Sequence, residues 1–236
     1  MKIKTFWSSK TSNEARFNCS NEKNNPRKGM FLTVILAVLL SFIGNTAIAQ
    51  ENNASKYLKG AVQVENGMVV FSKTYKASGK TKAQLYEALK DYIEKQVVEG
   101  ENHLEQSRIT ELDKDNGTIV ASMEEWLYFK KKAWVTNRTR FFYQLVAQAD
   151  EGSFKIEVRR IYYIYDEGNP ANANTAYRAE DWITDAEALN KAGTKLTKMA
   201  GKFRKFTIDR KDELFRGAAR ATGALKKVVK TIEVEE

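Results

Sequence analysis

Four consecutive stretches of β-forming residues, joined by short polar turns, constrain the fold of this chain more than any other feature. The alternation of side chains predicts strands at residues 108–113, 118–129, 139–149 and 154–165. The turn between the first two contains Asn116-Gly117, which accepts the positive φ angles that a tight hairpin needs. A second polar turn, at residues 150–153, joins the last two strands. Strands connected in this way pair with their neighbours, so we expect an antiparallel sheet.

One strand and one helix are predicted before this run. Residues 68–75 alternate and are rich in β formers, and Ser78-Gly79 ends them. Thr81 and Gln84 then have the spacing of a capping box, in which a hydroxyl and an amide three residues later bond the first turn of a helix. An apolar stripe at helical spacing follows, so we expect a helix over about 82–97.

Two further helices are predicted after the last strand. Thr184 and Glu187 form a second capping-box pattern, which indicates a short helix to about Ala192. A last helix is expected to begin at Thr207 or Asp209. One apolar face is predicted for it, formed by Ile208, Phe215, Ala219 and Thr222. The order β-α-β-β-β-β-α predicts an α+β domain with its helices on one face of the antiparallel sheet.

The most apolar stretch of the chain is residues 31–43, and its surroundings are typical of a secretory signal peptide. Two basic residues precede the run, and the small-residue site Ala-Ile-Ala at 47–49 follows it. A membrane-spanning helix needs about 20 apolar residues, and this run is shorter. We therefore expect cleavage after Ala49 and export to the periplasm or cell envelope, with an uncleaved anchor as the alternative.

The predicted cut divides the chain into four parts. They are a leader with signal peptide (1–49), a polar tether (50–66), a single α+β domain (67–225) and a charged tail (226–236). Seven of the 39 Lys and Arg and two of the 30 Asp and Glu precede the cut, so the exported part carries a net charge of +4 rather than +9. After cleavage the protein is not expected to be an integral membrane protein.

The scarcity of Cys and His restricts the chemistry. The only cysteine, Cys19, lies in the leader, and His103 is the only histidine. The exported part therefore has no disulfide, no Cys nucleophile and no imidazole or thiolate set for a metal. No sequence motif for a Ser nucleophile is present either. We expect a protein that is not an enzyme, with no metal site, no catalytic residues and no cofactor.

Paired carboxylates are the alternative to that expectation. Glu124 and Glu125 lie next to each other on a predicted strand, so they point to opposite faces and cannot act as a pair. Glu124 with Glu180 or Asp181 remains open. The alternative function is therefore a carboxylate-dependent hydrolase acting on envelope polymers.

Aromatic side chains on the strands indicate a binding face. Strand alternation and helices on the side of Phe141, Tyr143 and Leu145 would leave a second group of aromatic residues on the open face of the sheet. That group is Trp126, Tyr128, Phe142, Tyr163 and Tyr165. Such a face suits stacking on a sugar or packing against a partner. The alternative is a second small core under the loop at 166–181, or a dimer contact.

Basic residues gather near the C-terminus. Residues 195–230 contain twelve Lys and Arg against three acidic residues, whereas the rest of the exported part is acidic. A helix of this kind either is a solvated face or contacts an anionic surface such as lipid headgroups or an acidic polymer. The residues expected at that surface are Lys202, Arg204, Lys205, Arg210 and Lys211.

Two segments of the C-terminal half carry a resemblance to a known family. Residues 182–191 read WITDAEALNK and residues 201–215 read GKFRKFTIDRKDELF. With the preceding β-α-β4 run, about residues 68–222, they resemble a family of exported bacterial proteins of unknown function with a TATA-binding-protein-like fold. The resemblance implies a curved sheet backed by two helices and export in Gram-negative bacteria. It implies no activity and no catalytic residues.

The sequence thus predicts a non-catalytic exported protein that binds a ligand or serves a structural role in the envelope. Its partner would be an unidentified envelope ligand or protein, met through the aromatic sheet face, with the basic helix facing an anionic surface. Export separates the chain from DNA and RNA, which argues against nucleic acid as a partner.

Overall fold

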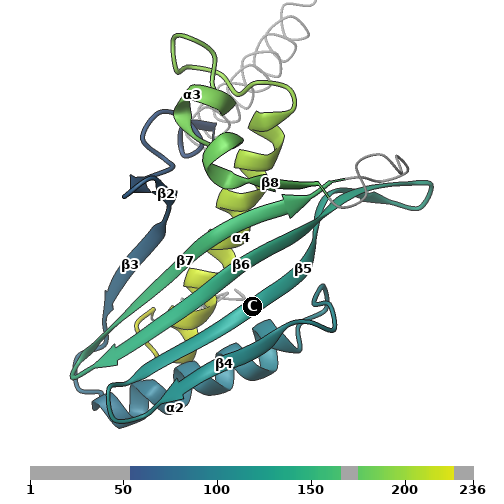
Figure 1. Ribbon diagram of the computed structural model, residues 1–236. Helices are drawn as coiled ribbons and strands as arrows, with labels where there is room; N and C mark the ends of the chain where they lie inside the picture. The colour runs from purple at the N-terminus through teal and green to yellow at the C-terminus, as the bar shows by residue number, and fades with distance from the viewer. Residues whose placement is uncertain (1–53, 166–174, 226–236) are drawn as a thin grey trace, which may run out of the picture. The chain divides into compact units, whose positions relative to one another are not determined.

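The computed structural model describes residues 54–165 and 175–225, and its centre is an open, twisted antiparallel sheet (Figure 1). The sheet order is β3-β7-β6-β5-β4, and a short strand, β8, also pairs with β7. The bounds are β3 (Phe71–Lys76), β4 (Arg108–Asp113), β5 (Thr118–Lys132), β6 (Val135–Asp150), β7 (Ser153–Ile164) and β8 (Ala176–Arg178). A separate small hairpin contains β1 (Val64–Glu65) and β2 (Met68–Val69).

Of the helices, the two long ones lie behind this sheet in Figure 1, and a short one lies above it. The helical segments are α2 (Lys82–Tyr92), its π-helical continuation η1 (Ile93–Val98), the 3-10 turn η3 (Ala179–Asp181), α3 (Asp185–Ala188) and α4 (Ala200–Ala221). The main elements follow one another as β3-α2-β4-β5-β6-β7-α4. The predicted α+β class and the order β-α-β-β-β-β-α are thereby confirmed. The capping box of Thr81 and Gln84 is formed, with both of its hydrogen bonds present.

Two predicted boundaries are wrong. The strand expected at residues 68–75 is divided at Val70, so that β2 pairs with β1 and only β3 joins the large sheet. The last helix begins at Ala200, several residues before Thr207. Gly201 lies inside this helix, where a Cβ would come within 2.7 Å of the Leu196 Cβ. The glycine therefore serves a close approach rather than ending a helix.

The core lies between the sheet and the helices, on the face predicted from alternation. Phe141, Tyr143 and Leu145 of β6 are all buried there. Leu85 and Leu89 of α2 are buried with them. The predicted apolar face of α4 is buried as well. Its members are Ile208, Phe215, Ala219 and Thr222.

A β-bulge in β7 reverses which side chains face the core. The pairing of β6 with β7 shifts between Phe142 and Gln144, and Arg160 of the opposite strand has a positive φ of 54°. An extra residue in a strand re-aims every side chain that follows it. Val158 and Ile161, three residues apart, are consequently both buried. Simple alternation places Ile161 and Tyr163 on the wrong face for this reason.

Residues 54–66 do not form the tether expected from their polar composition. Tyr57 and Val62 belong to the buried core. The fully buried guanidinium of Arg204 donates to the backbone carbonyls of Tyr57, Leu58 and Ile183, at 2.6–2.8 Å. It also bonds the Asp185 carboxylate at 2.7 Å. The tether prediction is wrong because one internal arginine satisfies the backbone of the segment and holds it against α4.

Asp185, at the first position of α3, also bonds the N-terminal segment. Its second oxygen accepts from the Gly60 backbone amide at 2.8 Å. The Thr184 side chain makes no cap bond, and α3 ends at Ala188. The second predicted capping box is therefore wrong, because a tertiary contact uses the first turn of this helix.

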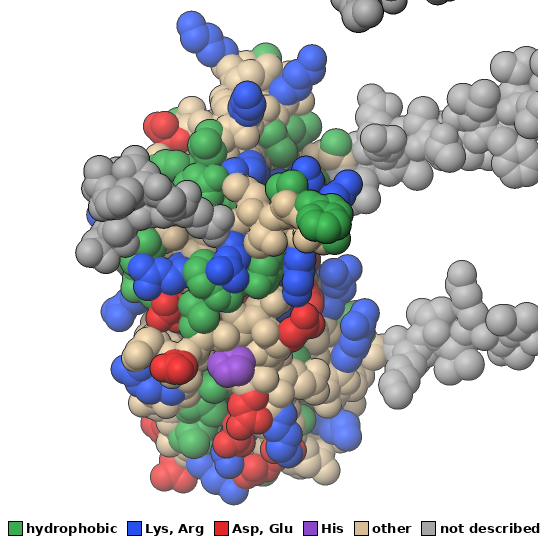
Figure 2. All heavy atoms as spheres, turned by 90° about the vertical axis from the view of Figure 1, so that its right-hand side faces the viewer, with side chains coloured by type: hydrophobic (Ala, Val, Ile, Leu, Met, Phe, Trp, Pro, Cys, Tyr) green, Lys and Arg blue, Asp and Glu red, His purple; other side chains and the backbone are tan. Residues whose placement is uncertain are grey.

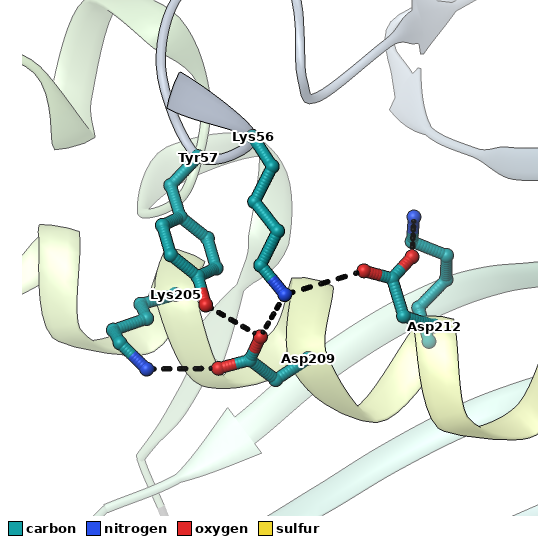
Figure 3. Close-up of polar contacts among 6 residues, drawn as sticks. Lys56, Tyr57, Lys205, Asp209 and Asp212 are labelled. Atoms are coloured by element: carbon teal, nitrogen blue, oxygen red, sulfur yellow. Dashed lines mark hydrogen bonds and ion pairs between the residues drawn. The ribbon is translucent and has the colours of Figure 1, made fainter. Parts of the chain in front are cut away.

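A polar network on α4 fixes the same N-terminal segment from the other side (Figure 3). The Asp209 carboxylate accepts from Lys56 at 2.7 Å, from the Tyr57 hydroxyl at 2.6 Å and from Lys205 at 2.8 Å. Burial raises the pKa of Asp209, but the hydrogen bonds from Lys205, Lys56 and Tyr57 outweigh it and hold the pKa below its usual range.

The segment Asn52–Glu236 forms a compact unit by itself, and all the described strands and helices belong to it. The predicted leader at 1–49 and the charged tail at 226–236 lie outside the described residues. Within residues 54–165 and 175–225, no helix is both long and apolar enough to cross a membrane.

We predict that Gly217→Ala destabilises the fold, although alanine is favoured over glycine in helices by about 1 kcal/mol. A Cβ at Gly217 would lie 2.6 Å from the Tyr92 ring of α2, whose hydroxyl also donates to the Leu214 carbonyl. Overpacking of this kind costs about 1–3 kcal/mol, which we expect chemical denaturation to show as a lower free energy of unfolding. In a Tyr92→Leu background the same change should cost less, and a stabilised Gly217→Ala protein would contradict the close crossing of the two helices.

We predict that Asp209→Asn lowers the free energy of unfolding at pH 7 and flattens its acid dependence. A carboxyl whose folded-state pKa lies below its unfolded value stabilises the fold above pH about 4, and this contribution is lost as the pH falls through the folded-state pKa. Denaturation of the two proteins from pH 7 to pH 2 measures the effect. Parallel curves for the two would show that Asp209 does not stabilise the fold through its charge.

Candidate functional site

The uncovered face of the sheet carries a row of aromatic and arginine side chains, which we call the outer platform. It consists of Trp126 and Tyr128 of β5, Arg138, Arg140 and Phe142 of β6, and Tyr162 of β7. Cross-strand pairing places them together, with Tyr128 opposite Arg138, Trp126 opposite Arg140 and Phe142 opposite Tyr162. All six are at least partly exposed, because the helices lie on the other face.

The platform is ordered by contacts among its own side chains. The guanidinium carbon of Arg138 lies 3.6 Å from the centroid of the Trp126 ring, a cation–π contact. Phe142 and Tyr162 stack with their ring centroids 4.4 Å apart and their planes within 5°. The Arg140 guanidinium lies 5.8 Å from the Phe142 ring centroid and 3.5 Å from the Glu124 carboxylate. Charged and aromatic groups therefore alternate across three strands.

The bulge adds a further arginine to one end of the platform. Arg160 is exposed and lines two open depressions, of about 160 and 420 Å³, which lie on either side of Tyr162. The smaller is also lined by Phe142, and the larger by Arg178. Burial raises the pKa of the Tyr162 phenol, and the Glu124 carboxylate adds to the effect. The phenol can donate a hydrogen bond at neutral pH, as an ordinary tyrosine can.

Three of the five residues predicted for the binding face lie on it. Trp126, Tyr128 and Phe142 belong to the outer platform, but Tyr163 and Tyr165 do not. Tyr163 is fully buried on the helix side and shares a 2.7 Å hydrogen bond with the Thr207 hydroxyl.

Tyr165 is on the helix side as well. Its ring packs edge-on against Phe203 of α4, with the centroids 5.3 Å apart. The bulge at Arg160 is the physical reason for both errors, because it moves the tyrosines that follow it to the covered face.

Four members of the site were missed at the sequence level. Arg138 and Arg140 share the parity of Phe142 on one predicted strand, so alternation alone could have placed them beside it. The exposure of Tyr162 and Arg160 follows from the bulge. No residue type in that strand predicts a bulge.

The five basic residues predicted for an anionic surface are all held by internal partners. Lys202 donates to the Asn137 side chain at 3.2 Å and covers the Phe129 ring. Lys205 bonds Asp209, and Lys211 bonds Asp212 at 2.6 Å. Arg204 is fully buried, so the prediction is wrong for it outright. The inward side of α4 uses its positive charge for tertiary contacts, which the charge count of the sequence does not reveal.

Arg210 joins α4 to β5 through a nearly buried ion pair. Its guanidinium bonds both oxygens of Glu125, at 2.7 and 2.8 Å. Burial lowers the pKa of Arg210, but the charges of Glu125 and Tyr143 and the hydrogen bonds to Glu125 and Glu213 together raise it overall. The Tyr143 phenol lies next to the pair, and burial raises its pKa well above the usual range. A side chain held in this way is not available to an outside partner.

The carboxylates considered for a hydrolase do not form one group. Glu125 faces the helices, whereas Glu124 faces the outer platform and Arg140, as their adjacent positions on a strand predict. Glu180 accepts from the Val69 backbone amide at 2.7 Å and from Arg178. In the described part of the chain no three His, Cys, Asp or Glu side chains are placed to hold a metal ion.

Comparison with known proteins assigns the family. Residues 71–164 match the model of DUF4468, a domain of unknown function with TBP-like fold. The crystal structure of a DUF4468 family protein from Bacteroides ovatus is 36% identical to this chain, with a TM-score of 0.65, and the match covers 73% of this chain and 96% of that one. The chain belongs to the DUF4468 family. The predicted resemblance to a family of TATA-binding-protein-like fold is confirmed.

A second solved structure supports the fold alone. It is a TBP-like protein from Parabacteroides distasonis, 21% identical, with a TM-score of 0.56, and the match covers 68% of this chain and 96% of that one. No curated protein matches this chain. The DUF4468 model covers β3 to β7 and α2, so the C-terminal segments that carry the resemblance in the sequence lie outside the matched range.

We predict that Arg160→Gly is more stable than Arg160→Ala by about 1 kcal/mol. Both changes remove the side chain, but only glycine adopts the positive φ of 54° without a steric cost of about 1–2 kcal/mol. Chemical denaturation of the two variants isolates the backbone effect. Equal stabilities would mean that the bulge is not strained at this residue.

Proposed function

We propose that this DUF4468 protein is an exported, non-catalytic binding protein whose outer platform takes an extended acidic ligand. Export is supported by the signal-peptide pattern around residues 31–49. The observation that carries the proposal is the alternation of guanidinium and aromatic groups across three strands, with Arg138 stacked on Trp126 at 3.6 Å. Tyr, Trp and Arg are the residues that most often dominate binding energy in protein interfaces.

The charge of the platform favours an acidic partner. Arg138, Arg140 and Arg160 lie on or beside it, and Glu124 bonds Arg140. Guanidinium groups bind carboxylates and sulfates through paired N–H donors, and their flat faces stack on rings. Aromatic faces such as Phe142 and Tyr162 suit the apolar face of a sugar.

The openness of the site favours a long ligand over a small one. The depressions beside Tyr162 measure about 160 and 420 Å³; the larger is within the 300–1,000 Å³ of small-molecule pockets, but both are open rather than enclosing. Three strands about 4.8 Å apart give a flat area that a chain of rings could follow. An acidic polysaccharide has both the charge and the length.

The absence of catalysis is part of the proposal. Glu124, Glu125 and Glu180 are each bound by an arginine, namely Arg140, Arg210 and Arg178. An arginine beside a carboxylate stabilises its charged form and opposes its use as a general acid. A hydrolase would need one carboxyl that holds a proton near neutral pH.

The proposal predicts that residues 50–236 bind polygalacturonate but not neutral dextran in calorimetry. Trp126→Ala and Arg138→Gln should each weaken binding about tenfold, since removal of such an anchor costs more than 1 kcal/mol. The exposed Arg220→Gln on α4 is the matched control and should bind like the wild type. Because the platform is exposed, thermal unfolding of the variants should change little.

Two results would reject this function. The first is equal affinity for the acidic and the neutral polymer, because charge would then play no part. The second is a large loss of stability in Trp126→Ala, which would show that the ring is part of the structural core.

A further inference from the structure

The tip of the β5–β6 hairpin carries the most exposed large hydrophobic side chain of the described residues. β5 ends at Lys132 and β6 begins at Val135, so Ala133 and Trp134 form the turn. Trp134 is 95% exposed. The second most exposed large hydrophobic residue, Val64, is 51% exposed. A tryptophan in water without contacts gains nothing for the fold and exposes a large apolar surface.

The turn itself gives no reason for a tryptophan. Two-residue hairpin turns favour Asn-Gly or Gly because they need positive φ angles, and neither Ala133 nor Trp134 has one. A small polar residue would serve the backbone equally well at either position. The side chain of Trp134 is therefore unexplained by local conformation or by packing.

Three lysines stand directly before this turn. Lys130, Lys131 and Lys132 are all exposed. Within the described residues their only ion pair is that of Lys131 with Glu101, at 3.3 Å between two exposed groups. Such pairs are weak because water screens them. Val135, 48% exposed, adds apolar surface on the other side of the turn. Figure 2 shows Lys and Arg side chains next to hydrophobic ones on the side of the molecule toward which the hairpin points in Figure 1.

The tip also projects from the domain. Toward the tip, the pairing of β6 with β7 ends at Arg140. Residues 130–136, which lie beyond it, are all exposed. The three outermost pairs of the hairpin, Lys130 with Asn137 to Lys132 with Val135, extend by about 10 Å at 3.4 Å per residue. The hairpin can therefore reach a flat surface before the rest of the domain meets it.

We propose that this tip docks the protein on the surface of an anionic lipid bilayer. Tryptophan favours the boundary between headgroups and acyl chains, where its ring is in an apolar medium and its N–H meets polar groups. Lysines next to it are attracted by anionic headgroups within a Debye length of the surface. An acidic polymer would satisfy the lysines but offers no apolar layer for the Trp134 ring, so a bilayer fits both parts of the tip.

This site is distinct from the outer platform and does not depend on the function proposed for it. It also differs from the anionic surface that the sequence indicates on α4, where Lys202, Arg204 and Lys205 are held by internal partners. Lys130, Lys131 and Lys132 are instead exposed side chains at the end of the hairpin.

Flotation of residues 50–236 with vesicles tests the proposal, because this segment contains the whole compact unit and lacks the apolar leader. Phosphatidylcholine vesicles with 30% phosphatidylglycerol are compared with pure phosphatidylcholine at about 50 and 500 mM NaCl. We expect binding to the anionic vesicles at low salt, with a large loss at high salt.

Variants identify the part of the protein that binds. Trp134→Ala should weaken partitioning of the protein onto anionic vesicles about tenfold. Replacement of Lys130, Lys131 and Lys132 by Gln should weaken it on the order of a hundredfold. Leu112→Ala, which alters a side chain of β4 that is 49% exposed, is the matched control and should bind like the wild type. Thermal unfolding should be unchanged, since the tip has no buried contacts to lose.

Three outcomes would overturn the proposal. One is no binding of the wild type to anionic vesicles at low salt. Another is equal binding of Trp134→Ala, which would place the contact elsewhere. The third is binding to soluble polygalacturonate that Trp134→Ala weakens while vesicles are not bound, which would make the tip part of a polymer site.

Discussion

The two-residue repeat of the strands is the constraint on which this structure depends, because only one face of the sheet is covered by helices. Strand residues of one parity point toward α2 and α4, and those of the other parity lie on the uncovered face. The bulge at Arg160 reverses that parity once, in β7. Tyr163 enters the core because of it, and Tyr162 joins Phe142 on the outer platform. One strained residue thus supplies both a core tyrosine and a binding-face tyrosine.

The polar residues of α4 explain how a helix rich in lysine and arginine can face a sheet. Arg204 donates to three backbone carbonyls and to Asp185, and Arg210 forms a paired contact with Glu125. Charges buried in this way must be fully bonded, since an unpaired one costs several kcal/mol. They stabilise the position of residues 54–62 and of β5 relative to α4. The outer platform and the hairpin tip do not take part in these contacts.

Membership of DUF4468 and the TBP-like fold describe this architecture but not an activity. The two surfaces proposed for function share a feature of the sheet: β5 and β6 are longer than their neighbours. Their inner halves build the platform around Trp126 and Arg138, and their outer ends form the tip at Trp134. A ligand held on the platform would accordingly lie near a bilayer contacted by the tip.

The sequence by itself determined the antiparallel order of strands, the helix after Thr81 and the division of β6 into two faces, because turn residues and side-chain alternation are local signals. It also indicated Trp126, Tyr128 and Phe142 as surface residues. Only the tertiary structure decided on which face of the sheet Tyr163 and Tyr165 lie and which partners the basic residues of α4 bind. A bulge depends on the pairing of two strands, and the partner of a buried arginine lies up to about 150 residues away in the chain. Neither is written in the local pattern of residues.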